Sequence, residues 1–355
     1  MTSADLVVIG AGQSGLATAY AAARRGLKPL VLDASSGPGG SWPSYYDSLT
    51  LFSPARFSAL PGRMFPGDPD RYPHRDEVVD YLAAYTASFD ADVWFGSRVE
   101  QVTADGNGFT VAVTGGAPVR APAVVAASGG FGAPYRAELP GLEVFPGTVL
   151  HSGEYRNADA FAGARILVVG GGNSAVQIAV ELAAVASVTL TTRGPLRFQR
   201  QHILGRDFHW WLARTGLDTS RWGPRLIPGS VSVIDDGRYR AAIAAGRPDH
   251  QPLFDRLDGD RVMWADGTSE RVDVVLLATG YRPNLPYLAG TGALDSDGRP
   301  LHAGGLSTTV PGLGFVGLER QRSFASATLR GAGRDAAFVL DGLLRRSGRH
   351  VAAAR

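Results

Sequence analysis

Two segments of the chain share one pattern, an apolar run that leads into a glycine-rich turn. Residues 6–15 read LVVIGAGQSG, and residues 166–175 read ILVVGGGNSA. The first glycine of such a motif permits a tight turn, the second lets the backbone approach a pyrophosphate, and a small third residue keeps the next helix close to its strand. Amide groups at the helix start then face the phosphates. The two segments therefore predict two bound dinucleotides, for which FAD and a nicotinamide cofactor are the natural pair.

The residue that ends the second strand of each unit distinguishes the two sites. Asp33 lies 18 positions after Gly15, and Arg193 lies 18 positions after Ala175. An acidic side chain at this point accepts hydrogen bonds from a ribose, whereas an arginine suits a 2′-phosphate. We therefore expect the adenosine of FAD at the first site, and at the second site NADPH, with NADH as the alternative. The other interpretation of Arg193 is an exposed loop cation.

Composition limits the classes of protein that fit. The 355 residues, 45% of them hydrophobic, suffice for two packed domains. The net charge is +2 and the arginines are scattered, so no nucleic-acid partner is expected. There is no cysteine, which excludes a redox dithiol and a disulfide framework, and the seven histidines show no metal-ligand spacing. We expect no membrane segment, a cytoplasmic location and a small-molecule substrate, and a homodimer is left open.

These motifs need a particular architecture to position them. We expect an α/β fold with two Rossmann-like dinucleotide-binding domains, the NADPH domain inserted into the FAD domain. The FAD-binding domain would contain residues 1–155 and 281–355, and the NAD(P)H-binding domain residues 156–280. An aromatic and arginine-rich stretch at about 197–255 is expected to form an excursion or cap on the second domain.

Local patterns predict the remaining elements. Residues 75–87 have the apolar spacing of an amphipathic helix, and the irregular stretch 43–73 has the length of a functional loop. A long helix is expected at about 323–346. Strands are expected at 92–95, 98–103, 109–114, 124–129 and 274–281, the last two closing the two domains.

Three further motifs resemble the flavin-containing monooxygenases, which are class B flavoprotein monooxygenases. Residues 145–156, FPGTVLHSGEYR, resemble the family signature F-x-G-x-x-x-H-x-x-x-[YF]. Residues 278–281 are similar to the family's A-T-G-Y linker, and residues 40–42 to its G-G-x-W loop. The resemblance covers the chain except for about 197–255, and the length resembles a compact bacterial subgroup. Tyr155 stands where ketone-oxidising Baeyer–Villiger relatives carry Trp, which indicates the heteroatom-oxidising branch.

The resemblance implies a reaction. NADPH would deliver hydride to FAD, and the reduced flavin would take up O₂ as a hydroperoxide on carbon 4a. That electrophilic oxygen would pass to a soft nucleophile, a sulfide or an amine. The cofactor supplies the reactivity in such an enzyme, while the protein positions it and excludes water.

One position departs from the family pattern. Many members place an asparagine near the flavin and nicotinamide where this chain has Phe52 and Ser53. The departure predicts leakage of hydrogen peroxide, and it keeps open an NAD(P)H oxidase or flavin reductase that has lost oxygen transfer. A nonenzymatic FAD-bound sensor or scaffold is the third alternative, which the two intact motifs disfavour. His151 is better interpreted as a hydrogen-bonding residue at the domain hinge than as a catalytic base.

The motifs and the resemblance together give candidate site residues. No catalytic residue is assigned and no metal site is expected. The flavin-proximal candidates are Trp42, Phe52 and Ser53. The candidate cofactor-binding residues are Gly10, Gly12, Gln13, Ser14, Gly15, Asp33, Ala34, Gly40, Ser41, Trp42, Val99, Ser128, Gly129, Gly170, Gly172, Asn173, Ser174, Thr192, Arg193, Thr279, Gly280 and Tyr281.

Overall fold

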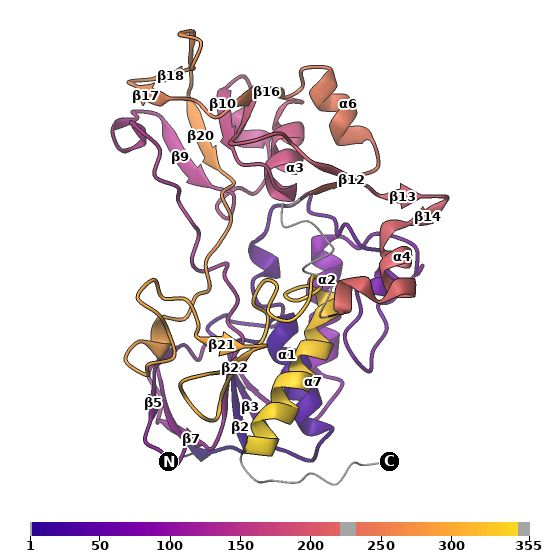
Figure 1. Cartoon of the computed structure of the whole chain (residues 1–355), viewed down its shortest axis with the longest axis vertical. Coiled ribbons are helices and arrows are strands. Elements are labelled where there is room, and N and C mark those ends of the chain that lie inside the picture. The colour runs from indigo at the N-terminus through magenta and orange to yellow at the C-terminus, as the bar shows by residue number, and fades with distance from the viewer. Residues whose placement is uncertain (1, 221–231, 347–355) are drawn as a thin grey trace.

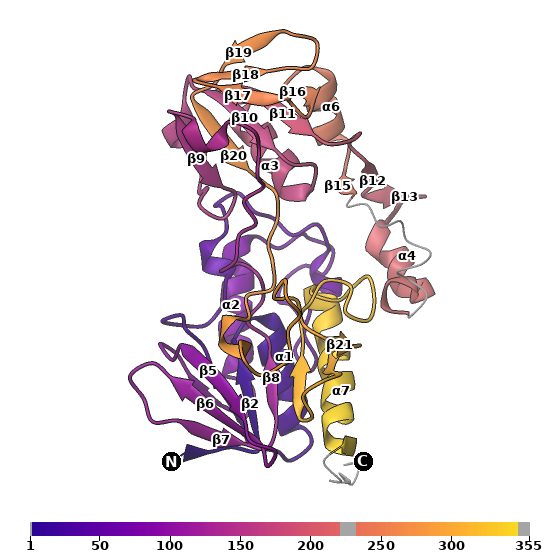
Figure 2. The same ribbon diagram turned by 60° about the vertical axis from the view of Figure 1, so that its left-hand side comes forward.

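The structure is a computed structural model that describes residues 2–220 and 232–346. Two sheets with parallel central strands lie one above the other along the long axis of the molecule (Figure 1). The chain passes between them before β9 (Thr148–His151) and after β20 (Val274–Leu277), as Figure 2 also shows. We call the part built on the seven-stranded sheet the first domain and the part built on the five-stranded sheet the second domain.

The first domain has its most buried strands in the centre of its sheet, whose order is β21-β22-β23-β8-β2-β3-β4. β2 (Leu6–Ile9) pairs in parallel with β3 (Pro29–Leu32) and β8 (Val124–Ala126). All residues of these three strands are buried, because layers cover both faces of the sheet. The outer strands are β4 (Asp92–Trp94), β21 (His302–Ala303), β22 (Leu306–Ser307) and β23 (Leu313–Phe315).

Different layers cover the two faces of this sheet. The helices α1 (Gln13–Ala23), α2 (Arg75–Thr86) and α7 (Leu329–Arg346) pack on one face. A smaller, mainly antiparallel sheet covers the other face, in the order β1-β7-β6-β5. Its strands are β1 (Thr2–Ser3), β5 (Val99–Ala104), β6 (Phe109–Val113) and β7 (Val119–Ala121).

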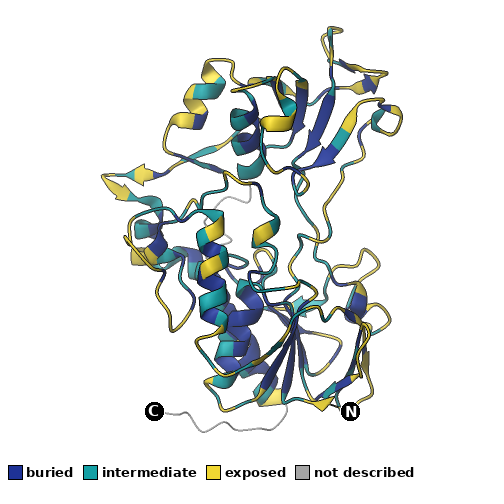
Figure 3. Ribbon diagram, turned by 180° about the vertical axis from the view of Figure 1, so that it is seen from behind, coloured by how far each residue is buried: buried dark blue, intermediate teal, exposed yellow. Residues whose placement is uncertain are grey.

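The second domain repeats this design on a smaller scale. Its parallel sheet has the order β16-β11-β10-β20-β9, with β10 (Arg165–Val169), β11 (Ser187–Thr192) and β16 (Asp249–Pro252) beside the two strands already named. α3 (Asn173–Leu182) and α6 (Arg238–Ala244) cover one face. The antiparallel strands β17 (Arg256–Asp258) and β18 (Arg261–Met263) carry residues that cover the other face, and β19 (Ser269–Arg271) pairs with β18. Figure 3 shows the buried residues gathered in the central strands of both sheets.

Short 3-10 helices lie in the connections. They are Trp42–Ser44, Ala55–Phe57, Leu142–Val144, Asp159–Phe161, Leu217–Thr219 and Pro286–Leu288. No helix among residues 2–220 and 232–346 is long and apolar enough to cross a membrane.

Two expected boundaries differ from the structure. β9 pairs with β20, so the second sheet already begins before the expected boundary at residue 155. The last helix begins at Leu329 rather than near Ser323. The reason is that hydroxyl groups compete for the backbone there: Ser326 Oγ accepts hydrogen bonds from the amides of Arg322 and Ser323, at 3.2 and 3.1 Å. The residues before α7 therefore form turns.

The expected excursion at 197–255 divides into two parts. Residues 238–252 belong to the second domain itself, because they form α6 and β16, which pairs with β11. The other part contains β12 (Phe198–Arg200), β13 (His202–Ile203), β14 (Arg206–Asp207), α4 (Phe208–Thr215) and β15 (Val233–Asp235). Residues 221–231 of the expected excursion lie outside the described residues.

The part of the excursion before residue 221 contacts the first domain. We call residues 198–220 the bridging segment. Its Asp218 accepts hydrogen bonds from Arg330 of α7 at 2.6 and 3.3 Å, and Thr219 accepts one from Arg334 at 2.7 Å. The excursion from the second domain therefore also reaches the first domain, through ionic and polar contacts with α7.

Candidate functional site

The helices that follow the two glycine-rich turns differ from the others at their first turns. Gly12 and Gly172 are the N-cap residues of α1 and α3, and neither helix has a side-chain cap or an acidic residue in its first turn. In contrast, α2 is capped by His74, α4 by Asp207, and the first amides of α6 by Asp235. The amides at the start of α1 and α3 therefore lack side-chain acceptors within the described residues. Such a helix start is suited to bind an anionic phosphate.

A side chain at each of the three glycines of the first turn would meet a different environment. Gly10 has φ +106°, and a Cβ there would lie 2.6 Å from the Ala127 carbonyl oxygen. A Cβ at Gly15 would lie 1.7 Å from the Gly10 carbonyl oxygen. A Cβ at Gly12 would meet no protein atom within 4 Å. Gly12 thus borders open space in front of α1, as expected where a pyrophosphate approaches the backbone. The first turn therefore fits the phosphate part of FAD.

The second turn has the same backbone constraint at its first glycine. Gly170 has φ +148°, and a Cβ there would lie 2.3 Å from the Ala278 carbonyl oxygen. Gly172 is extended, with φ −92° and ψ −177°, like Gly12 with φ −74° and ψ −175°. The two turns are therefore matched in backbone geometry.

Asp33 lies beside the first turn, as the sequence predicts. Its side chain is buried, and Oδ2 accepts a hydrogen bond from the Ala11 amide at 2.5 Å. Oδ1 accepts from the Ser35 amide at 2.7 Å and from the Ser35 hydroxyl. Because each carboxylate oxygen has two lone pairs, Asp33 keeps acceptor capacity for a ribose. Sequence reasoning missed Ser35, although Asp-x-Ser is a pattern typical of local side-chain hydrogen bonds. Ala34 between them is exposed.

The loop with Gly40, Ser41 and Trp42 packs directly on the first turn. A Cβ at Gly40 would lie 2.7 Å from Gly12 Cα, and Trp42 Nε1 donates to Gln13 Oε1 at 2.9 Å. Ser41 precedes the 3-10 helix that contains Trp42. The structure therefore brings together five candidates that the sequence placed in two separate motifs.

Four other candidates lie around the first turn, two of them buried and two in contact with the returning chain. Ser14 is buried in the first turn of α1, and Val99 lies in the core between the two sheets. The Ser128 hydroxyl lies 2.7 Å from the Asn284 carbonyl oxygen and 2.8 Å from the Tyr287 hydroxyl. Gly129, with φ +66°, accepts a hydrogen bond from the Asn284 amide at 2.9 Å. Ser128 and Gly129 therefore bind the chain that returns from the second domain.

The polar candidate residues of the second turn differ in whether their side chains already bond to other protein groups. Asn173 Oδ1 accepts from the Ile234 amide at 3.1 Å, and Ser174 lies in the first turn of α3. Thr192 is buried, with its hydroxyl 2.7 Å from the Gly194 carbonyl oxygen and 2.9 Å from His250 Nε2. Arg193 is exposed and makes no ion pair with any acidic side chain among residues 2–220 and 232–346. Of these groups, Arg193 is the one available to a 2′-phosphate.

His151 connects the two segments that pass between the domains. It is fully buried; Nδ1 accepts from the Gly153 amide at 3.1 Å, and Nε2 lies 3.0 Å from the Gly280 carbonyl oxygen. Nε2 therefore carries the hydrogen, and burial lowers the pKa of His151. These contacts fit the interpretation of His151 as a hydrogen-bonding residue at the passage between the domains.

The A-T-G-Y segment surrounds this histidine. Gly280 has φ +85°, and the Thr279 hydroxyl donates to the Tyr135 carbonyl oxygen. Tyr281 meets the His151 ring edge-on, with 4.9 Å between ring centroids, and stacks on Phe131 at 5.3 Å. Three residues predicted to bind cofactor thus also fix the passage between the domains.

Tyr155, the residue that indicates the heteroatom-oxidising branch, lies in the core of the second domain. It is buried next to Tyr46, with 6.1 Å between ring centroids, and its hydroxyl has no hydrogen-bond partner within the described residues. Burial raises its pKa, so the phenol stays protonated.

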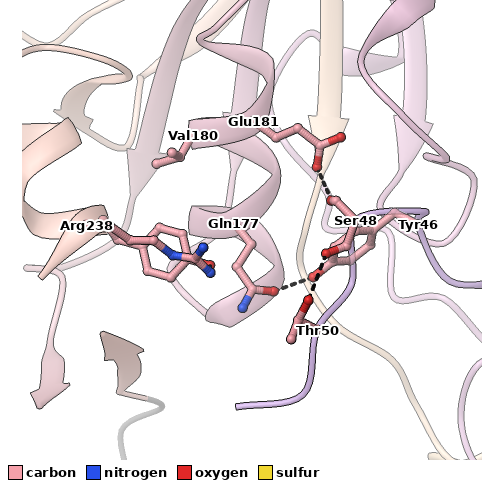
Figure 4. A pocket seen from close by; sticks show the side chains of 8 residues that line it. Tyr46, Ser48, Thr50, Gln177, Val180, Glu181 and Arg238 are labelled. Carbon is pink, nitrogen blue, oxygen red and sulfur yellow. Dashed lines mark hydrogen bonds between the residues drawn. The ribbon is translucent and has the colours of Figure 1, made fainter. Parts of the chain in front are cut away.

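A cavity of about 200 Å³ lies between the long loop of the first domain and α3 and α6 (Figure 4). The Tyr46 hydroxyl donates to Gln177, and the Ser48 hydroxyl donates to Glu181, across the domain boundary. Tyr46 even belongs to the hydrophobic cluster of the second domain. None of the predicted site residues lines this cavity. Its side chains therefore fix how the domains sit together, and sequence reasoning missed them because the loop shows no periodic pattern.

Phe52 and Ser53 lie in the same long loop, at the bridging segment. Phe52 is 37% exposed; its carbonyl oxygen accepts from Gln201 Nε2 at 3.1 Å, and its ring stacks on His209 with 5.9 Å between centroids. The Ser53 hydroxyl lies 2.8 Å from that of Ser58. The second domain thus contacts a flavin-proximal candidate directly.

Comparison with known proteins gives consistent results. Residues 7–210 match a family model described as pyridine nucleotide-disulphide oxidoreductase. The structure resembles a flavin-containing monooxygenase from Stenotrophomonas maltophilia with a TM-score of 0.86 and 34% identity, over 98% of this chain and 99% of that one. An uncharacterized CzcO-like oxidoreductase of Geobacillus kaustophilus is 33% identical over 96% of this chain and 98% of its own length. Indole-3-pyruvate monooxygenase YUCCA1 of Oryza sativa is 30% identical, over 79% of this chain and 77% of its own length.

Proposed function

Since the chain belongs to the flavin-containing monooxygenases, which use FAD and NADPH, we propose that it oxygenates soft nucleophiles such as sulfides and amines. The observation that carries the assignment is the pair of matched turns, each followed by a helix without a side-chain cap. The chain has no cysteine, so the dithiol chemistry named in the description of the family model is unavailable to it.

The residues of the two turns have separate roles in this proposal. The start of α1 beside Gly12 binds the pyrophosphate of FAD, and Asp33 accepts hydrogen bonds from its ribose. The start of α3 binds the pyrophosphate of NADPH, and Arg193 pairs with its 2′-phosphate. When bound, FAD reduced by NADPH supplies the oxidising chemistry by taking up O₂ as a hydroperoxide. The protein's contribution is to hold both dinucleotides and exclude water.

The domain division follows from this proposal. We assign FAD to the first domain and NADPH to the second, inserted domain, with passages before β9 and after β20 rather than at residue 155. A cytoplasmic location remains a prediction from the sequence, and the sequence leaves a homodimer open.

A substrate panel tests the proposed reaction. The purified protein is expected to release FAD on denaturation and to convert aryl alkyl sulfides to sulfoxides, with little lactone from cyclic ketones. The panel includes a 2-oxo acid, because the Oryza sativa relative is named for indole-3-pyruvate. Efficient lactone formation without sulfoxide would reverse the branch assignment that rests on Tyr155.

The alternative is an NAD(P)H oxidase or flavin reductase, and Phe52 is the observation that favours it. A phenyl ring in place of an amide offers no hydrogen bond to the oxygen chemistry at the flavin. The measurement is the yield of sulfoxide and of hydrogen peroxide for each NADPH consumed. Peroxide alone, with every substrate of the panel, would replace the monooxygenase proposal by the oxidase.

A further inference from the structure

The bridging segment holds Phe52 from two directions. Gln201 donates to the backbone carbonyl of Phe52 at 3.1 Å. His209 lies against the Phe52 ring, with 5.9 Å between centroids and 23° between ring planes. Both contacting residues belong to the second domain by sequence, whereas Phe52 belongs to the long loop of the first domain. The orientation of Phe52 therefore depends on a segment of the other domain.

One carboxylate organises these contacts. Asp207 accepts a hydrogen bond from Gln201 Nε2 at 2.5 Å, from His209 Nδ1 at 3.0 Å and from the Tyr72 hydroxyl at 2.6 Å. It also caps α4 through the His209 amide at 2.7 Å. Tyr72 comes from the first domain, so Asp207 receives donors from both domains. A carboxylate with this many donors defines one arrangement of its partners.

Burial and charge support this arrangement. The side chains of Asp207 and His209 are only 11% and 8% exposed. Burial alone would raise the pKa of Asp207, but the hydrogen bonds from His209, Tyr72 and Gln201 hold it below its usual value. Asp207 is therefore ionised at neutral pH, and it keeps the hydrogen of His209 on Nδ1. The histidine ring that stacks on Phe52 is thus fixed in one orientation.

We propose that Asp207 and His209 are positioning residues for Phe52, through which the second domain controls how oxygen chemistry at the flavin is divided between substrate and hydrogen peroxide. The proposal rests on the proposed function and on the sequence-based prediction that Phe52 and Ser53 lie near the flavin. Phe52 cannot hydrogen-bond the oxygenated flavin, so its contribution is to exclude water, and exclusion of water requires that its ring stays in place. The contacts that hold the Phe52 ring then determine how much hydrogen peroxide is released.

The test compares four variants of the FAD-loaded protein. His209→Ala removes the stacked ring, and His209→Phe keeps a ring but loses the hydrogen bond to Asp207. Tyr72→Phe removes one donor to Asp207 without touching Phe52. Thr219→Ala is the matched control, because it removes a contact between the bridging segment and α7 that does not involve Phe52.

Hydrogen exchange and circular dichroism are measured without turnover, and the ratio of products is measured during turnover. For His209→Ala we expect faster amide hydrogen exchange in residues 49–53 and an altered visible circular dichroism of the bound flavin. In turnover, the ratio of peroxide to sulfoxide should rise about two- to tenfold, the range that loss of one aromatic pair allows. His209→Phe and Tyr72→Phe should give smaller rises. The anaerobic rate of flavin reduction by NADPH should stay unchanged in all four variants.

The outcomes separate this proposal from the proposed function. Unchanged exchange, dichroism and product ratio in His209→Ala would overturn the positioning role, as would an equal change in Thr219→Ala. If the unmodified protein forms peroxide but no sulfoxide, the monooxygenase proposal fails by itself. In that case the exchange and dichroism measurements still decide whether Asp207 and His209 position Phe52.

Discussion

The two glycine-rich turns have matching backbones but very different surroundings. The first turn is covered by the loop with Trp42, and its carboxylate, Asp33, is 8% exposed and bonded to protein amides. The second turn ends at Arg193, which is exposed and unpaired within residues 2–220 and 232–346. The backbone determines what kind of ligand binds at each turn, and the surroundings determine how easily it leaves. Under the proposed function, this comparison predicts that FAD is retained at the first turn and that NADPH exchanges at the second.

Distant parts of the chain produce the enclosure of the first turn. Gln13 donates to the Ala327 carbonyl oxygen at 3.3 Å, and a Cβ at Gly317 would lie 2.5 Å from Ser14 Oγ. The segment before α7 therefore completes the first site. The described neighbours of the second turn come from a shorter stretch of sequence, such as Ile234 and His250. Under the proposed function, the contacts of this C-terminal segment with the first turn would help retain FAD.

The largest expected effect is the loss of FAD from Gly12→Val. A Cβ at Gly12 meets no protein atom within 4 Å and φ is −74°, so the variant should fold. Its side chain would fill the space in front of α1, and FAD affinity should fall by at least about a hundredfold. The measurement is flavin absorbance after gel filtration. Retention of FAD at the normal level would contradict the placement of its pyrophosphate.

Gly10→Ala is the matched control, because it should damage the protein rather than the ligand site. Gly10 has φ +106°, and the Cβ would lie 2.6 Å from the Ala127 carbonyl oxygen. We expect a clear fall in the melting temperature of the FAD-free protein, which Gly12→Val should not show.

Gly172→Val makes the same change at the second turn, where it should prevent NADPH binding rather than FAD binding. The position is extended, so a side chain is tolerated by the backbone. FAD should remain bound while NADPH no longer reduces it, and a chemical reductant should still do so. Loss of FAD from this variant would show that the two sites are not separable.

A smaller effect is expected from Arg193→Ala. A charge-assisted hydrogen bond contributes about 1.5–3 kcal/mol, so the preference for NADPH over NADH should fall by about tenfold or more. The lower end applies because Arg193 is exposed, and raising the salt concentration should also reduce the preference of the unmodified protein. The measurement is the Michaelis constant for each nucleotide, with exposed Arg24→Ala as control. Equal use of both nucleotides by the unmodified protein would identify Arg193 as a solvated loop cation.

Sequence alone predicted the parts of the molecule that have local signals. The strands before both turns, the helices after them and the position of Asp33 follow from apolar runs and glycine spacing. The contacts of Phe52 with Gln201 and His209 had no such signal, because they join residues about 150 positions apart. For the same reason the contacts of the bridging segment with α7 were not predicted: its aromatic and arginine content gives no sign of which surface it meets. The start of α7 was missed because Ser326 binds backbone amides that a helix would otherwise use.

The smallest expected effect concerns His151, which lies between the two sites. Burial lowers its pKa from the ordinary value of 6.5, so the unfolded chain takes up the proton before the folded one does. Stability should therefore fall as the pH drops below about 6.5 towards the pKa in the folded protein, and should not change above that range.

His151→Gln isolates this contribution, because His250 and His302 also have pKa values lowered by burial and remain in the variant. The difference in melting temperature between the unmodified protein and the variant should shrink on acidification. Protonation of Nδ1 breaks its bond from the Gly153 amide and loosens the passage between the domains. NADPH affinity should consequently weaken at low pH more than FAD retention does, since the first site is closed by contacts within its own domain. An equal loss of NADPH and FAD at low pH would place the acid-sensitive step at the first turn instead. It would also contradict the distinction between an enclosed first turn and an open second turn.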